Sequence, residues 1–154
     1  MKDTINWQWH HFDDLTTEQA HDMFALRQEV FILEQDCIYQ DIDGKDKEAY
    51  HLLGWQDKKL VATLRVFESY QPYFNNASLG RVCTHQSVRR YGLGKELVQR
   101  AIIFIQENFP NKAVQIGAQH YLKKFYDDLG FRQISDIYDE DGIDHILMIK
   151  DNAS

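Results

Sequence analysis

The chain has 154 residues, of which 44% are hydrophobic and 27% charged, and this balance favours one domain, residues 1–154, with a real hydrophobic core. The formal net charge of −7 argues against a broad nucleic-acid-binding surface, and no apolar run approaches the roughly 20 residues that cross a bilayer. The N-terminus lacks the apolar core of a signal peptide, and the two cysteines, Cys37 and Cys83, lack CxxC spacing. We therefore expect a soluble, cytoplasmic protein that binds neither nucleic acid nor membrane.

The first third of the chain changes its hydrophobic period twice. Residues 4–11 alternate apolar and polar side chains, which predicts a half-buried strand. Thr16 and Gln19 have the spacing of a capping box, and apolar residues then recur at helical spacing, so we expect a helix within residues 15–35. Its buried stripe would be Met23, Leu26, Val30 and Leu33. Residues 36–49 are acidic and unpatterned, which indicates mostly loop, with room for a short helix.

The rest of the chain alternates between the two periods. We expect strands at 50–56, 60–69, 78–85, 112–118, 132–138 and 144–150, a helix that runs from the glycines near 92 to Pro110, and a short helix within 119–131. Gly130 is the expected C-cap of the short helix, and Asp141-Gly142 is a strong hairpin-turn signal. This order predicts an α/β (α+β) fold with a central mixed β-sheet, helices on its faces and a C-terminal β-hairpin.

Residues 89–97, RRYGLGKEL, begin the long helix with two glycines and several cations. Gly92 and Gly94 fall in the first turn, where main-chain amides lack helical partners and the helix dipole favours an anion. Glycine has no Cβ, so a diphosphate could approach the main chain, and Arg89, Arg90 and Lys95 add positive charge. The alternative is a glycine-kinked loop with solvated arginines.

Two familiar phosphate-binding loops do not fit this stretch. A P-loop would need glycine at position 89 and Ser or Thr at position 96, where the chain has Arg89 and Glu96. A dinucleotide-binding fingerprint would need a third glycine at position 97, which is Leu97. We therefore expect a diphosphate held by another kind of loop.

Several segments together resemble one enzyme family. Residues 79–98, LGRVCTHQSVRRYGLGKELV, resemble motif A of the GCN5-related N-acetyltransferase (GNAT) family, and 125–131, FYDDLGF, resemble its second motif. Residues 30–46, 116–119 and 138–146 look closer still to the ElaA-type subgroup of small bacterial acetyltransferases. The resemblance covers nearly the whole chain. It implies a GNAT-like acyl-CoA N-acyltransferase fold and transfer of an acetyl group from acetyl-CoA to a primary amine.

The resemblance also implies roles for individual residues. Main-chain groups of Val82, Cys83 and Thr84 would hold the pantetheine arm, and Gln119 stands where the family often has an asparagine that contacts it. The diphosphate loop would comprise Arg89, Arg90, Tyr91, Gly92, Leu93, Gly94 and Lys95. Tyr126 would donate a proton to the departing sulfur; the alternative is a core aromatic beside Phe125.

The general base is less defined by the sequence, since the strand of motif A carries no glutamate. We take Glu34 as the candidate, because it lies where the first helix runs into the acidic loop. Asp41, Asp43, His51 and His85 are alternatives, as are a water chain and an amine that arrives neutral. Cys83 fits a small apolar strand residue better than a nucleophile.

Other functions stay open at this point. The fold could use a longer acyl donor, or the chain could be a non-catalytic CoA-binding module. The histidines are scattered without metal-ligand spacing, so we expect no metal. The family resemblance implies acetyl-CoA as co-substrate. Polyamines, aminoglycosides, amino acids and protein N-termini are all conceivable acceptors. Tyr70, Tyr73 and Phe74 could form a homodimer contact or cap the core.

Overall fold

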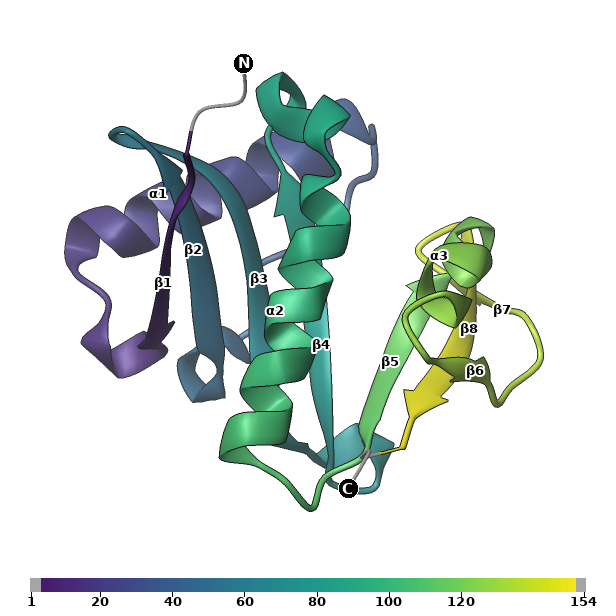
Figure 1. Ribbon diagram of the computed structural model, residues 1–154. Coiled ribbons are helices and arrows are strands. Elements are labelled where there is room, and N and C mark those ends of the chain that lie inside the picture. Colours follow the sequence, from purple (N-terminus) through teal and green to yellow (C-terminus); the bar gives the residue numbers. More distant parts are fainter. Residues whose placement is uncertain (1–3, 152–154) are drawn as a thin grey trace.

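The computed structural model describes residues 4–151, which form an eight-stranded mixed sheet with helices on both faces (Figure 1). The spatial order is β1-β2-β3-β4-β5-β8-β6, and β7 pairs with β8. The strands are β1 (Asn6–His11), β2 (Tyr50–Gln56), β3 (Lys59–Tyr70), β4 (Asn76–Thr84), β5 (Val114–Gln119), β6 (Arg132–Gln133), β7 (Tyr138–Glu140) and β8 (Ile143–Lys150). The helices are α1 (Thr17–Arg27), α2 (Leu93–Asn108) and α3 (Lys123–Asp127). The predicted succession of strands and helices is confirmed.

The helix predicted within 15–35 begins as expected but changes its winding. Thr16 Oγ1 accepts a hydrogen bond from the Gln19 amide at 3.1 Å, and Gln19 Oε1 accepts one from the Thr16 amide at 2.9 Å, so the capping box is confirmed. After α1 the chain continues as a π-helix, Gln28–Glu34. A π-helix bonds residue i to i+5, which rotates later residues away from a stripe of period 3.6. Leu33 is therefore 67% exposed, and its prediction as a buried residue is wrong.

The two long helices cover opposite faces of the sheet (Figure 1). α1 packs through Met23 and Leu26 on the face of the sheet that carries Leu53 and Cys83. α2 buries the predicted stripe, namely Leu93, Leu97, Val98, Ala101, Ile102 and Ile105, in the larger core cluster. The helix stops two residues before Pro110, which cannot continue it.

β4 and β5 form a parallel pair that separates almost at once. The pairing recorded between them joins Ala77 to Val114, at the start of both strands, and the strands then diverge (Figure 1). β4 also has a bulge at Arg81 (φ 50°), which shifts its register against β3. A bulge bends and twists its strand, as suits a strand that leaves its neighbour. The sequence predicts the strand but neither the bulge nor the divergence.

The terminal hairpin turns where predicted, at Asp141 (φ 53°) and Gly142 (φ 83°), both in the left-handed region. The strand expected over 132–138 is interrupted, which corrects that prediction. Ser135 Oγ accepts a hydrogen bond from the Leu147 amide at 2.8 Å, so a side chain replaces one ladder partner between β6 and β7.

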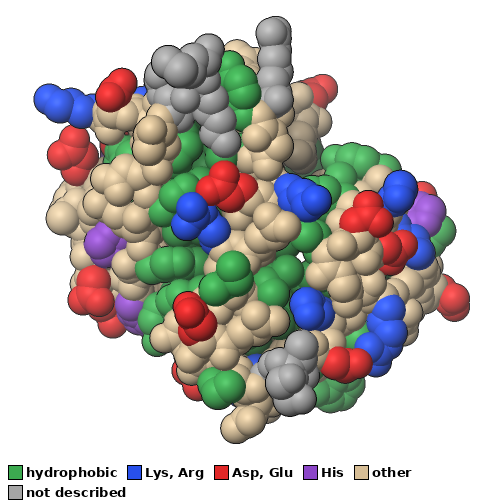
Figure 2. All heavy atoms as spheres, in the orientation of Figure 1, with side chains coloured by type: hydrophobic (Ala, Val, Ile, Leu, Met, Phe, Trp, Pro, Cys, Tyr) green, Lys and Arg blue, Asp and Glu red, His purple; other side chains and the backbone are tan. Residues whose placement is uncertain are grey.

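Acidic and basic side chains are interspersed on the face that α2 covers, as Figure 2 shows in the same orientation. Within residues 4–151, no helix is both long enough and apolar enough to cross a membrane.

Candidate active site

A cavity of about 920 Å³ occupies the space where β4 and β5 diverge. Its lining includes residues 78–84 of β4, residues 116–119 of β5, Gly94 at the start of α2, Tyr126 of α3 and His145 of β8. The predicted site residues that line it are Glu34, Val82, Cys83, Thr84, Arg89, Gly94, Gln119 and Tyr126. Residues far apart in the sequence thus meet at one opening in the sheet.

The glycine turn has the geometry that the sequence predicts. Gly92 adopts φ 67° and caps α2, a conformation that favours glycine. The Glu96 amide donates to the Gly92 carbonyl at 3.2 Å, so the amides of residues 93–95 precede the helical ladder and lie at its positive end. A Cβ built at Gly92 or at Gly94 would meet no protein atom within 4 Å, which leaves the main chain open to a ligand.

The other residues of this loop lie around the turn. Tyr91 and Lys95 are exposed, and the side chain of Leu93 is buried in the core, so Leu93 could offer a ligand its amide alone. The side chain of Arg90 lies outside the described residues.

Arg89 is exposed, yet its side chain links the end of β4 to the π-helix. Its guanidinium donates to the Thr84 carbonyl at the end of β4, at 2.9 and 3.2 Å, and lies 2.7 Å from Glu34 Oε2 of the π-helix. The carboxylate chosen as general base is therefore engaged by a cation.

β4 presents one edge to β3 and the other to the cavity. Thr84 pairs with Ala62 and Cys83 with Thr63, while β5 has already diverged on the other side. The Cys83 side chain is buried, and burial raises its thiol pKa to about 12. Cys83 is thus a packed, protonated thiol, as expected of a structural residue rather than a nucleophile.

Tyr126 lies on α3 with its ring between Phe125 and Phe131, at centroid distances of 5.0 and 5.7 Å. Although the residue is only 7% exposed, it lines the cavity, and its hydroxyl makes no hydrogen bond to the described residues. Burial raises its pKa to about 12, so the phenol stays protonated near neutral pH. Tyr126 is both a core aromatic and a possible proton donor to the cavity.

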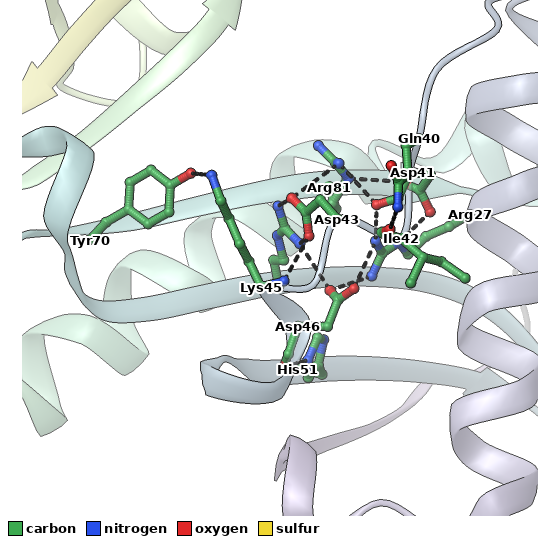
Figure 3. Close-up of polar contacts among 11 residues, drawn as sticks. Arg27, Gln40, Asp41, Ile42, Asp43, Lys45, Asp46, His51, Tyr70 and Arg81 are labelled. Carbon is green, nitrogen blue, oxygen red and sulfur yellow. Dashed lines mark hydrogen bonds and ion pairs between the residues drawn. The ribbon is translucent and has the colours of Figure 1, made fainter.

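The acidic loop 36–49 is held by a buried ion-pair network (Figure 3). The pairs join Arg27 to Asp41 (2.9 Å) and Asp46 (2.7 Å), Arg65 to Asp43 (2.8 Å) and Asp46 (3.0 Å), and Arg81 to Asp41 (2.7 Å). Burial favours the protonated form of Asp43, but hydrogen bonds and charge from Arg65 prevail and hold its pKa well below the usual range. Asp41 and Asp43, both alternative bases in the sequence, therefore serve as anchors of the loop.

The two histidine alternatives are each held by a main-chain contact. His51 is 1% exposed, and burial lowers its pKa to about 4. Its Nε2 lies 3.0 Å from the Asp46 carbonyl oxygen, and a neutral ring protonated at Nε2 can donate a hydrogen bond to that oxygen. His85 precedes the glycine turn, where its Nδ1 accepts from the Ser87 amide at 3.1 Å. Neither belongs to the described cavity lining.

Sequence reasoning missed a cluster on the C-terminal hairpin. Glu140, Asp141 and His145 line the cavity together with Tyr73, which precedes β4. His145 Nε2 lies 3.3 Å from Glu140 Oε2. The Asp141-Gly142 turn signal could have shown that Glu140 and His145 flank one turn, but not which face of the sheet they share. Tyr70 and Tyr73 also line the cavity, whereas Phe74 is 87% exposed.

Comparison with known proteins identifies the class. A family model described as the acetyltransferase (GNAT) domain matches residues 12–152, and the chain belongs to this family, whose members use acyl-CoA. The fold is the GNAT acyl-CoA N-acyltransferase fold.

Individual relatives cover almost the whole chain. A UPF0039 protein of Synechocystis is 44% identical over 146 residues, 94% of each chain. The crystal structure of Escherichia coli ElaA is 35% identical with a TM-score of 0.89, covering 96% of this chain and 100% of that one. An acyl-CoA N-acyltransferase from Pseudomonas aeruginosa is 34% identical with a TM-score of 0.91, covering 96% of this chain and 99% of the other. The resemblance to ElaA-type proteins is thereby confirmed.

Proposed function

We propose that this GNAT protein is an N-acetyltransferase that moves an acetyl group from acetyl-CoA to a primary amine by direct attack. The observation that carries the proposal is one cavity lined by the free edge of β4, the first turn of α2 and Tyr126. The first turn of α2 suits the diphosphate of a donor, the β4 edge suits an extended amide-bearing arm, and Tyr126 suits a terminal thioester.

The donor would be anchored by main-chain groups. Amides of residues 90–95 would bind its diphosphate, supported by the α2 dipole. Val82, Cys83 and Thr84 would pair with the pantetheine arm as an added strand, and Gln119 on β5 lies across the same cavity. One β4 amide would polarise the thioester carbonyl; such a donor is typically worth about 3–4 kcal/mol.

The chemistry then needs two proton transfers. The amine nitrogen forms a bond to the thioester carbon and loses a proton, and the carbon–sulfur bond breaks as the sulfur gains one. Tyr126 would supply the proton to sulfur, since its phenol is protonated near neutral pH and lines the cavity. Glu34 stays a prediction as the proton acceptor, although Arg89 already holds its carboxylate.

Thiol release tests the function directly. The protein would be mixed with acetyl-CoA and a panel of amines that includes polyamines, amino acids, aminoglycosides and peptides, and free CoA thiol would be measured with a chromogenic disulfide. We expect amine-dependent thiol release with at least one acceptor. Donors with longer acyl chains would be run in parallel; turnover with these alone would contradict the acetyl assignment, and CoA binding without turnover would indicate a non-catalytic module.

A further inference from the structure

The strand pair β5–β8 presents two different faces to the cavity. Ala118 opposite Ile146 packs in the core cluster that also contains Tyr126. Gln119 opposite His145 is the next pair along, and since successive residues of a strand point to opposite faces, this pair lies on the other side of the sheet. His145 and Tyr126 therefore approach the cavity from opposite faces.

The face that carries His145 is the one toward the acidic loop. Cys37 Sγ of that loop lies 3.7 Å from the Asp141 carbonyl, so loop and hairpin meet beside the cavity. Tyr70 and Tyr73 line the cavity there, and the hydroxyls of Tyr73 and Tyr138 both lie over Gly117, where a Cβ would be 2.9 and 3.0 Å from them. This chamber combines aromatic rings with the carboxylates of Glu140 and Asp141, a setting that suits an ammonium group.

Hydrogen bonding determines the state of the His145 ring. Nδ1 lies 2.8 Å from the Ile143 carbonyl, which can only accept, so Nδ1 carries the proton and donates it. In the neutral ring the remaining lone pair is on Nε2, the atom 3.3 Å from Glu140 Oε2. Once Nε2 takes up a proton, both ring nitrogens have an acceptor, and the Glu140 carboxylate stabilises the imidazolium.

The other candidate bases in the described cavity lack this arrangement. Glu34 is paired with Arg89 at 2.7 Å, and Asp43 with Arg65 at 2.8 Å, so each carboxylate already has a cationic partner. His145 is only 7% exposed yet lines the cavity, and its charged neighbour is an anion.

We propose that His145 Nε2 is the general base that removes a proton from a primary alkylammonium acceptor held in the chamber by Glu140 and Asp141. This assignment rests on the proposed acetyl transfer. The ammonium proton passes to Nε2, and the freed nitrogen lone pair forms the carbon–nitrogen bond. The carbon–sulfur electron pair leaves with sulfur, which takes a proton from Tyr126. The nitrogen then loses its second proton through solvent, which restores the Tyr126 phenol and leaves a neutral amide. Glu140 Oε2 lies 3.3 Å from Nε2 itself, so Glu140 would contact the acceptor directly beside the nitrogen that takes its proton.

Among the described residues, Glu140 and Asp141 are the hairpin carboxylates that line the cavity with His145. β7 contributes Glu140 and Tyr138, and the segment before β4 contributes Tyr73, whose hydroxyl lies with that of Tyr138 over Gly117. Burial raises the pKa of both phenols, so they stay neutral through the acidic and neutral range. Neither phenol would therefore contribute an acidic limb to a pH–rate profile.

The test compares His145→Gln with Glu34→Gln, using kcat/KM for the amine between pH 5 and 9 and calorimetry with acetyl-CoA. We expect His145→Gln to lower kcat/KM by roughly 10²–10⁴-fold, to lose the acidic limb, and to bind acetyl-CoA within about twofold of wild type. Added imidazole should restore part of the turnover of His145→Ala. His21→Gln, an exposed histidine on α1, is the matched control and should behave as wild type.

Two failures are distinguishable in this experiment. A wild-type protein that releases no thiol with any amine overturns the proposed function, and the assignment of His145 with it. An active wild type whose His145→Gln variant keeps the acidic limb, while Glu34→Gln loses it, overturns the assignment of His145 alone. A folded His145→Ala variant that imidazole does not rescue would also count against it, because a residue that merely packs has no reason to respond to imidazole.

Discussion

At the scale of single residues, the chemistry depends on side chains whose protonation is set by burial. Tyr126 and Cys83 are both buried, and burial raises the pKa of each to about 12. The consequence differs, since a protonated phenol is a useful acid whereas a protonated thiol is a poor nucleophile. Direct attack with Tyr126 as acid is therefore chemically more consistent with the site than a covalent intermediate on Cys83.

Replacing Tyr126 by phenylalanine removes the hydroxyl and keeps the ring that packs against Phe125 and Phe131. We expect kcat for thiol release to fall by about 10²-fold or more, with acetyl-CoA affinity within a few-fold of wild type. Steady-state kinetics and calorimetry measure the two quantities. Tyr50→Phe, on β2 and away from the cavity, is the control, and unchanged kcat in Tyr126→Phe would remove Tyr126 from the mechanism.

His51 provides a pH test of stability. Burial lowers its pKa from 6.5 to about 4, so between these values the unfolded chain binds a proton that the folded chain refuses. The free energy of unfolding should therefore fall as pH drops from about 6.5 to about 4. In His51→Gln, the free energy of unfolding should depend less steeply on pH over this window. Urea unfolding at several pH values measures the slopes; equal slopes for the two proteins over this window would contradict the assignment.

At the scale of elements, the loop 36–49 behaves as part of the scaffold because arginines from α1, β3 and β4 hold it. Arg27 is 1% exposed and pairs with both Asp41 and Asp46. Breaking a buried ion pair on one side leaves an uncompensated charge, which is costly. The network thus explains how an acidic, unpatterned segment is ordered beside the cavity.

Arg27→Gln tests this network. It should lower the free energy of unfolding by roughly 3–5 kcal/mol, because the three carboxylates of the network keep only two cations, Arg65 and Arg81, and one buried charge is left uncompensated. Arg132→Gln, which breaks an exposed pair with Asp151, is the control and should change stability by less than about 1 kcal/mol. Denaturant unfolding provides both values, and similar losses in the two variants would contradict a special role for the buried network.

At the scale of the whole molecule, the sequence anticipates features that local chemistry determines. The Thr16–Gln19 cap, the stripe of α2, Gly92 at the helix start and the Asp141-Gly142 turn were all predictable, because each depends on residues close in the chain. The resemblance to GNAT proteins also predicts a donor loop at residues 89–95, of which Arg89 and Gly94 line the cavity.

Features that depend on distant residues were not predictable in the same way. The bulge at Arg81 and the divergence of β4 from β5 arise from sheet pairing, and the exposure of Leu33 follows from π-helical winding. The His145–Glu140 pair becomes a site only when β8 pairs with β5 and places one face of the hairpin against the acidic loop. Periodicity identifies a buried side of an element but not its partner.

The central claim is that the first turn of α2 binds the diphosphate of CoA, and calorimetry with acetyl-CoA on Gly94→Val tests it most directly. A Cβ at Gly94 meets no protein atom within 4 Å, so the fold should tolerate the side chain while a bound diphosphate would not. Gln99→Val, exposed on the same helix, is the matched control. We predict that affinity falls at least tenfold in Gly94→Val with no loss of melting temperature, and remains as in wild type in the control. Wild-type affinity in Gly94→Val, or no heat with any CoA species for the wild-type protein, would contradict the claim.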